Sequence, residues 1–225
     1  MSWVISNWSM IWDLTLTHVS LSIPPIVLGF IISLPLGWLA HRYKLTRGAL
    51  LTISGILYAI PSLPLFVIMP SIIGTQILDP ANVVVALTIY AIALLVRTIA
   101  DALDAVDAGT RQSAQAVGFS AWQRFWRVEF PLAGPLMLAG VRVVSASTIS
   151  LLSVGALVGV TNLGYLFTDG YARQFPTEII TGIVGTVLIA VVFDVILVVL
   201  GRLLMPWTRI SSKRAIRRRR EAAMA

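Results

Sequence analysis

The sequence contains no cysteine and few charged residues. Only 12% of its 225 residues are Asp, Glu, Lys or Arg, whereas 57% are hydrophobic, and the mean hydropathy is +0.88. The absence of cysteine excludes disulfides and thiolate metal sites, and His18 and His41 share no metal-ligand spacing. Soluble domains carry about 25% charged residues, so this composition predicts a membrane protein without a metal site.

Signatures of catalysis are also missing. The chain has no Gly-Lys pair and therefore no P-loop to hold a nucleotide, so it is not expected to hydrolyse ATP. Its loops contain no Ser-His-Asp or paired-carboxylate arrangement, which argues against a small membrane enzyme.

Five hydrophobic stretches are long enough to cross a bilayer as helices, which predicts an all-α integral membrane protein. The predicted spans lie at about 17–40, 49–73, 82–101, 132–160 and 178–204 within a transmembrane domain at 17–204. Residues 1–16 carry Trp3, Trp8 and Trp12 and no signal-peptide features, so they are predicted to form an interfacial segment outside the membrane. A basic tail is predicted at 205–225.

The net charge of +7 comes from basic residues that are concentrated in every second segment between the hydrophobic stretches. Three follow the first stretch, three lie in the loop at 102–131 and eight follow Gly201, whereas the gap at 74–82 has none and the gap at 161–176 only Arg173. The positive-inside rule therefore predicts an external N-terminus and a cytoplasmic C-terminus. Basic residues so placed contact anionic membrane lipid, and nucleic-acid binding is not expected.

The loop at 102–131 is unusually aromatic. At helical period Phe119, Trp122, Phe125 and Trp126 share one face, which predicts an amphipathic helix of about three turns that ends before Pro131. Such a helix lies on lipid or fits a groove on a soluble partner, and periodicity does not separate the two.

The string QSAQAVGFSAWQRFWRVEFP, which begins at Gln112, resembles the EAA loop of permease subunits of bacterial ABC importers. That loop reads Glu-Ala-Ala, three residues, Gly, nine residues, a branched aliphatic, one residue, Leu-Pro. The spacing is complete here, with Gln112, Ser113 and Phe130 in place of the Glu, the first Ala and the Leu. The resemblance implies that the loop docks in a cleft on a separate ATP-binding subunit. The residues predicted to couple to that ATPase are Gln112, Ala114, Gly118, Trp122, Arg124, Phe125, Glu129 and Pro131.

Other strings, among them LYAIPSLPLFVIMPSI and ALTIYAIALLVRTIADAL, look like the osmoprotectant branch of these permeases. The resemblance implies a bacterial inner-membrane subunit for uptake of glycine betaine, choline, carnitine or similar solutes. Its implied partners are an ATP-binding subunit that carries ATP and Mg, a second permease chain of the same or a related kind, and an extracytoplasmic solute-binding protein. The chain itself would hold no cofactor. A methionine or other amino-acid importer is the alternative, and an ion-coupled carrier is a more distant one.

The second predicted span contains several prolines, which kink helices and often mark transport paths. The pathway candidates are Tyr58, Pro61, Ser62, Pro64, Phe66 and Tyr90. The open alternative is a packing kink among ordinary core aromatics.

Three charged residues fall within or near spans. At a rise of about 1.5 Å per residue, Arg97, Arg142 and Asp194 reach compatible depths. Because a lone charge in a bilayer costs at least about 2.5–3.5 kcal/mol, Asp194 is predicted to pair with Arg142 or Arg97. A substrate role for Asp194 is the alternative.

Overall fold

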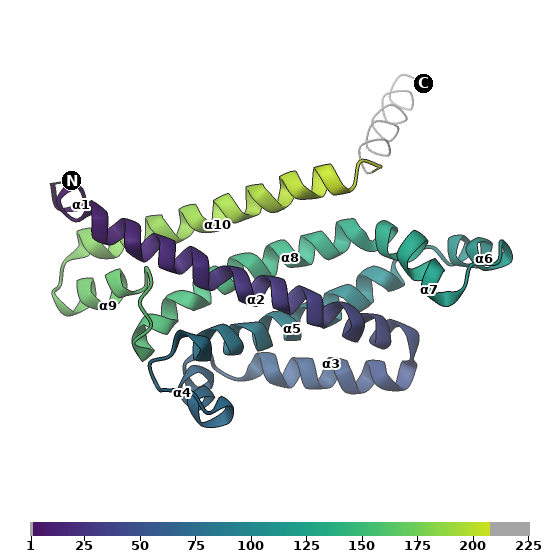
Figure 1. The fold of residues 1–225 in the computed structure, drawn as a ribbon, viewed down its shortest axis with the longest axis horizontal. Helices are drawn as coiled ribbons and strands as arrows, with labels where there is room; N and C mark the ends of the chain where they lie inside the picture. Colours follow the sequence, from purple (N-terminus) through teal and green to yellow (C-terminus); the bar gives the residue numbers. More distant parts are fainter. Residues whose placement is uncertain (1, 208–225) are drawn as a thin grey trace, which may run out of the picture.

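The computed structural model describes residues 2–207, and every regular element in that range is helical, which confirms the predicted class (Figure 1). The elements are α1 (Ser2–Ser6), α2 (Trp8–Arg42), α3 (Lys44–Ala59), α4 (Ser62–Ile73), α5 (Pro80–Asp104), α6 (Ala108–Ala116), α7 (Ala121–Arg124), the π-helical turn η1 (Phe125–Glu129), α8 (Phe130–Leu152), the 3-10 segment η2 (Ser153–Val158), α9 (Tyr165–Ala172) and α10 (Pro176–Leu204). Most of the predicted basic tail lies outside the described residues.

Four helical stretches are long and apolar enough to cross a membrane, namely α2, α5, the run from Ala121 to Val158, and α10. The second predicted span, at about 49–73, is broken, because α3 and α4 meet at an angle of 105°. Ile60 adopts an extended conformation before Pro61, as expected of a residue that precedes proline. The Tyr90 hydroxyl donates a hydrogen bond to the Ile60 carbonyl, which the break leaves without a helical partner.

The first spanning helix begins earlier than predicted. α2 starts at Trp8, so residues 8–16 continue directly into the span and do not form a separate segment. The polar residues there do not interrupt it, because the hydroxyls of Thr15 and Thr17 donate to carbonyls four residues back. At about 1.5 Å per residue its 35 residues extend roughly 52 Å, more than the hydrocarbon thickness of about 30 Å.

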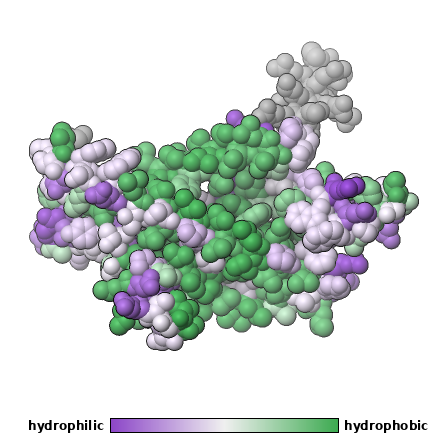
Figure 2. All heavy atoms as spheres, viewed as in Figure 1, coloured by the Kyte–Doolittle hydropathy of each residue, from purple (hydrophilic) through white to green (hydrophobic). Residues whose placement is uncertain are grey.

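α5 lies at the centre and contacts α2, α3, α4 and α8. α10 packs on α8 and α9 at one edge and leaves most of its apolar side chains exposed. Hydrophobic side chains cover the middle of the face in Figure 2, whereas hydrophilic ones gather at its two ends. The chain begins at the end that carries α9, and α10 finishes toward the end that carries α6 and α7 (Figure 1).

The contact between α2 and α5 depends on glycine. A Cβ atom on Gly29 would lie 2.4 Å from the Cβ of Ala91, and one on Gly37 would lie 2.6 Å from a methyl carbon of Ile99. Any side chain at these positions would therefore push the two most extensively packed helices apart.

We expect Gly29→Ala to lower the thermal midpoint of the purified chain in mild detergent, because overpacking a core typically costs about 1–3 kcal/mol. The control is Gly55→Ala in α3, where nothing lies within 4 Å of the added Cβ. That variant should unfold at or above the wild-type midpoint, since alanine favours helix over glycine. Equal midpoints for the two variants would contradict the close approach of α2 and α5.

Candidate functional site

The residues predicted to couple to an ATPase lie at the α6–α7 end. Asp107 caps α6, where its carboxylate accepts from the backbone N–H of Thr110 at 2.8 Å and from its hydroxyl at 3.2 Å. These bonds hold the pKa of Asp107 below its usual range. The cap therefore stabilises α6 at pH values above the ordinary carboxyl pKa, and this stabilisation is lost as the pH falls through the lowered pKa. α6 ends at Ala116, and Gly118 turns the chain with φ of +90°, a value that favours glycine.

α7 begins with a capping box. The Ser120 hydroxyl accepts from the backbone N–H of Gln123 at 3.2 Å, and the Gln123 side chain accepts from the Ser120 N–H at 3.0 Å. The prediction that this helix ends before Pro131 is wrong, because the chain passes through η1 into α8 without a break. Pro131 sits in the first turn of α8, directly after the wider π turn in which the Phe130 N–H donates to the Phe125 carbonyl. Its missing N–H is tolerated at that position.

The aromatic face of this helix is divided between the protein and its surroundings. Phe125 is buried and meets Trp38 of α2 edge to face, with ring centroids 6.2 Å apart. Trp122 is 66% exposed and Trp126 is 41% exposed. Phe125 therefore anchors the helix, and Trp122 and Trp126 present apolar surface at a polar end of the molecule.

Two of the predicted coupling residues pair with each other. The Arg124 Nε donates to the Glu129 carboxylate at 2.7 Å, and Glu129 is only 2% exposed. The five-residue separation follows the π-helical turn between them. Glu129 therefore stabilises this turn from inside the protein.

An ionic network that the sequence analysis missed ties the ends of three helices together. Arg47 of α3 contacts Asp101 at 2.9 Å and also Asp104, both in α5. The His41 Nδ1 at the end of α2 lies 2.5 Å from Asp104. Asp101 and Asp104 are three residues apart and so share a helix face, which is the signal that could have revealed the network.

The intramembrane charges form one bidentate pair. Arg142 of α8 donates to both carboxylate oxygens of Asp194 in α10, at 2.6 and 2.8 Å. Arg97, the other candidate partner, points away, is 73% exposed and lies 3.8 Å from Asp101. The two paired side chains are 41% and 42% exposed on the single chain. At membrane depth such a pair needs protein or water over it rather than lipid.

The candidates in the second span gather around its break. Tyr58 meets Tyr90 edge to face, with centroids 6.1 Å apart, and Tyr90 also hydrogen-bonds Ile60. Phe66 and Tyr90 are buried in a core cluster. Tyr58 is 49% exposed. Pro61 and Pro64 are exposed, and Ser62 is half-buried.

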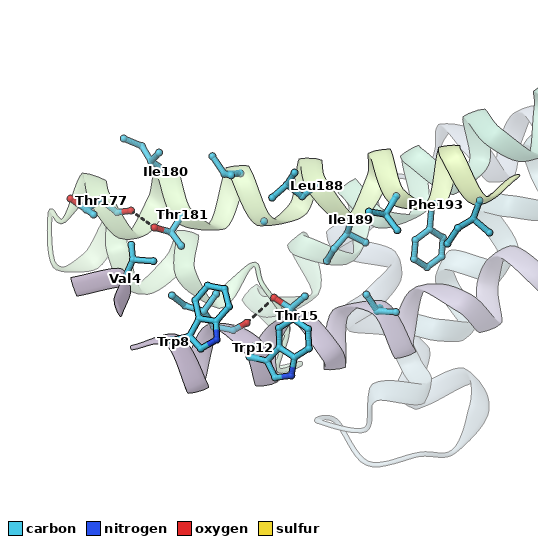
Figure 3. A pocket seen from close by; sticks show the side chains of 16 residues that line it. Val4, Trp8, Trp12, Thr15, Thr177, Ile180, Thr181, Leu188, Ile189 and Phe193 are labelled. Atoms are coloured by element: carbon cyan, nitrogen blue, oxygen red, sulfur yellow. Dashed lines mark hydrogen bonds between the residues drawn. The ribbon is translucent and has the colours of Figure 1, made fainter. Parts of the chain in front are cut away.

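An apolar groove of about 910 Å³ lies between α2 and α10 near the α9 end (Figure 3). Trp8 and Trp12 line one side, and Ile180 and Leu188 line the other. Of the threonines that line it, Thr15 and Thr181 donate their hydroxyls to carbonyls of their own helices.

Two fully buried ionisable side chains lie toward the α9 end. Glu178 is fully buried and pairs with Arg173, which also binds Asp169. His18 is fully buried, and its Nε2 lies 3.0 Å from the Ile149 carbonyl. Within residues 2–207 no cluster of three His, Asp or Glu side chains could hold a metal ion.

Residues 33–210 match the family described as "Binding-protein-dependent transport system inner membrane component". The chain belongs to this family. It is a multi-pass permease subunit of an ABC importer, as the EAA-like loop predicted. It lacks ATPase activity of its own, as the missing P-loop predicted. Importers of this family work with an ATPase and a solute-binding protein.

Named relatives share most of the chain. The osmoprotectant import permease protein OsmW of Salmonella typhimurium is 32% identical over 196 residues, which cover 85% of this chain and 90% of that protein. The glycine betaine/carnitine/choline transport system permease protein OpuCB of Bacillus subtilis is 28% identical, with 84% and 86% covered.

A solved structure shares the fold. An inward-facing structure of the methionine ABC transporter MetNI superposes with a TM-score of 0.73 at 22% identity, over 85% of this chain and 96% of that chain. The predicted type of permease fold is confirmed.

We expect Asp194→Asn to lower the thermal midpoint, because it leaves Arg142 without its counter-charge at membrane depth. The double variant Arg142→Asp with Asp194→Arg should recover most of the loss. Arg97→Gln is the control and should change the midpoint little. A double variant no more stable than Asp194→Asn would show that charge pairing does not hold α8 to α10.

Proposed function

We propose that this chain forms one half of the translocation pathway of an ATP-driven importer for compatible solutes such as glycine betaine, choline or carnitine. The supporting observation is the likeness to OsmW and OpuCB along most of both chains. The likeness to the methionine transporter is one of fold at 22% identity, and a fold shared at this level does not determine the solute.

The α6–α7 end is proposed to face the cytoplasm, with the N-terminus outside. Arg42, Lys44 and Arg47 gather at this end with the basic residues of the loop and of α6. The α9 end carries Arg173, which is already paired with two carboxylates. This asymmetry is the one that the positive-inside rule associates with a cytoplasmic face.

Residues 112–131 are proposed to receive the movement of the ATPase. The exposed indole of Trp122 lies on a capped helix that continues through η1 into α8. Because the three elements form one helix, a push on α7 moves α8 and, through the Arg142–Asp194 pair, α10. The π turn between α7 and α8 is held by the Arg124–Glu129 pair, and such turns often occur at functional sites.

The solute path is proposed to pass the break between α3 and α4. Tyr58 presents an exposed aromatic ring there beside the buried Tyr90, and quaternary ammonium groups bind such rings through cation–π attraction. A second permease chain, identical or related, would complete the path.

Uptake by proteoliposomes tests the proposed solute class. With the ATP-binding subunit and the solute-binding protein present, labelled glycine betaine should enter only when ATP is supplied, and excess methionine should not compete. Uptake by this chain alone on an ion gradient would contradict the proposal. ATP-dependent uptake of methionine but not of glycine betaine would support an ATP-driven importer but contradict the proposed solute class.

We expect Trp122→Ala to abolish ATP-dependent uptake and to reduce retention of the ATP-binding subunit on the immobilised permease by roughly tenfold or more, as for an aromatic interface anchor. Its thermal midpoint should stay near that of wild type, because the side chain is exposed. Trp12→Ala is the control, since Trp12 is 51% exposed but lies toward the opposite end. Unchanged uptake by Trp122→Ala would contradict the proposed docking.

A further inference from the structure

A pocket of about 350 Å³ opens where the end of α2 meets α6 and α7. It is lined by His41, Arg42, Ala108, Arg111, Gln112, Gln115 and Arg124. No lining residue is acidic, whereas three are arginines, so the pocket is suited to an anionic group.

Some of the side chains around this pocket already contact a carboxylate. Arg124 pairs with Glu129 at 2.7 Å, and the His41 Nδ1 lies 2.5 Å from Asp104. Outside the pocket, Arg47 and Arg97 also contact carboxylates of α5.

Arg42 and Arg111 differ from these. Among residues 2–207 neither guanidinium forms an ion pair, and the contact made by Arg111 is with the His41 Nε2 at 3.4 Å. The nearest acid along the chain, Asp107, uses its carboxylate to cap α6. Two guanidinium groups that form no ion pair within residues 2–207 therefore line one pocket, together with the amides of Gln112 and Gln115. Asp107 interacts with Arg111 only at longer range.

We propose that this pocket receives an Asp or Glu side chain of the ATP-binding subunit. Guanidinium groups bind carboxylates through paired, charge-assisted hydrogen bonds, and the two glutamine amides supply further donors. This inference rests on the proposed coupling function. It adds the polarity of the contact: the permease contributes the cations and the ATPase the anion.

A protein occupant fits the position of the pocket. α6 and α7 follow the end of α5 and project beyond the long helices (Figure 1). The pocket is lined by residues of α6, of α7 and of the end of α2, so it lies at the proposed cytoplasmic end. The neighbouring Trp122 presents an exposed apolar ring on α7. A cationic hollow beside an apolar anchor matches a protein surface that carries an acidic residue next to a hydrophobic cleft.

The test compares charge reversals in the assembled complex. The full-length chain, in nanodiscs of phosphatidylcholine alone, is titrated with its ATP-binding subunit, and the apparent Kd is measured. Arg111→Glu and Arg42→Glu should each weaken binding roughly tenfold or more, with the effect shrinking at high salt. Lys44→Glu, the same reversal at an exposed residue outside the pocket, should change the Kd less than about threefold. A matching Asp or Glu to Arg change in the ATPase should restore binding to Arg111→Glu.

Several outcomes would overturn this inference. Equal effects of Arg42→Glu and Lys44→Glu would show that only the general charge of this face matters. Binding of wild type that requires added phosphatidylglycerol, and loses that requirement in Arg111→Glu, would assign the pocket to lipid headgroups. Arg42→Glu keeps the test decisive if Arg111→Glu elutes as aggregate on gel filtration.

Failure of the proposed function looks different. If wild type binds no ATP-binding subunit at all, the coupling role itself is wrong. If wild type binds, Trp122→Ala does not, and the two arginine reversals bind normally, only the acidic contact is refuted.

Discussion

Inside a bilayer no water satisfies a polar group, and this constraint accounts for the polar contacts within the spans. The carbonyl that the break at Pro61 leaves free is bonded by Tyr90. Thr88 and Thr98 donate to carbonyls of their own helix four residues back. Arg142 and Asp194 satisfy each other through two hydrogen bonds. These departures from a plain apolar helix thus have partners, whereas the buried hydroxyls of Ser33 and Ser145 have none among the described residues. The partnered groups position the helices that would surround a solute.

The continuity of α7, η1 and α8 determines how this end of the protein would respond to a partner. A loop joined by flexible residues would absorb a push, whereas a helix with an internal capping box and a buried anchor at Phe125 transmits it. The ion pair between Arg124 and Glu129 braces the one irregular turn in the helix. The end of α5 beside it is bound to α3 through the ion pairs of Arg47 with Asp101 and Asp104. A movement of α7 and α8 would therefore occur relative to a helix end that is tied to its neighbour.

Hydropathy and the EAA-like spacing predicted the helical class, the family and the approximate spans, because both signals are local in the sequence. The course of α7 was less accessible: Pro131 indicated a boundary, but a π turn has no residue signature of its own. The rise per residue along a helix placed two arginines, Arg97 and Arg142, at a depth compatible with that of Asp194. Which of them faces Asp194 depends on how each helix is rotated about its axis, and packing sets that rotation in favour of Arg142. The angle between α3 and α4 likewise depends on contacts with α5 that are distant in the sequence.

The exposed indoles of Trp122 and Trp126 have a cost when the chain is alone. A subunit made in excess of its partners therefore leaves this apolar surface uncovered by the ATP-binding subunit. Such orphan subunits associate nonspecifically or become targets of proteolytic quality control. The aromatic ring that would serve the assembled transporter therefore also makes balanced synthesis of its components a requirement.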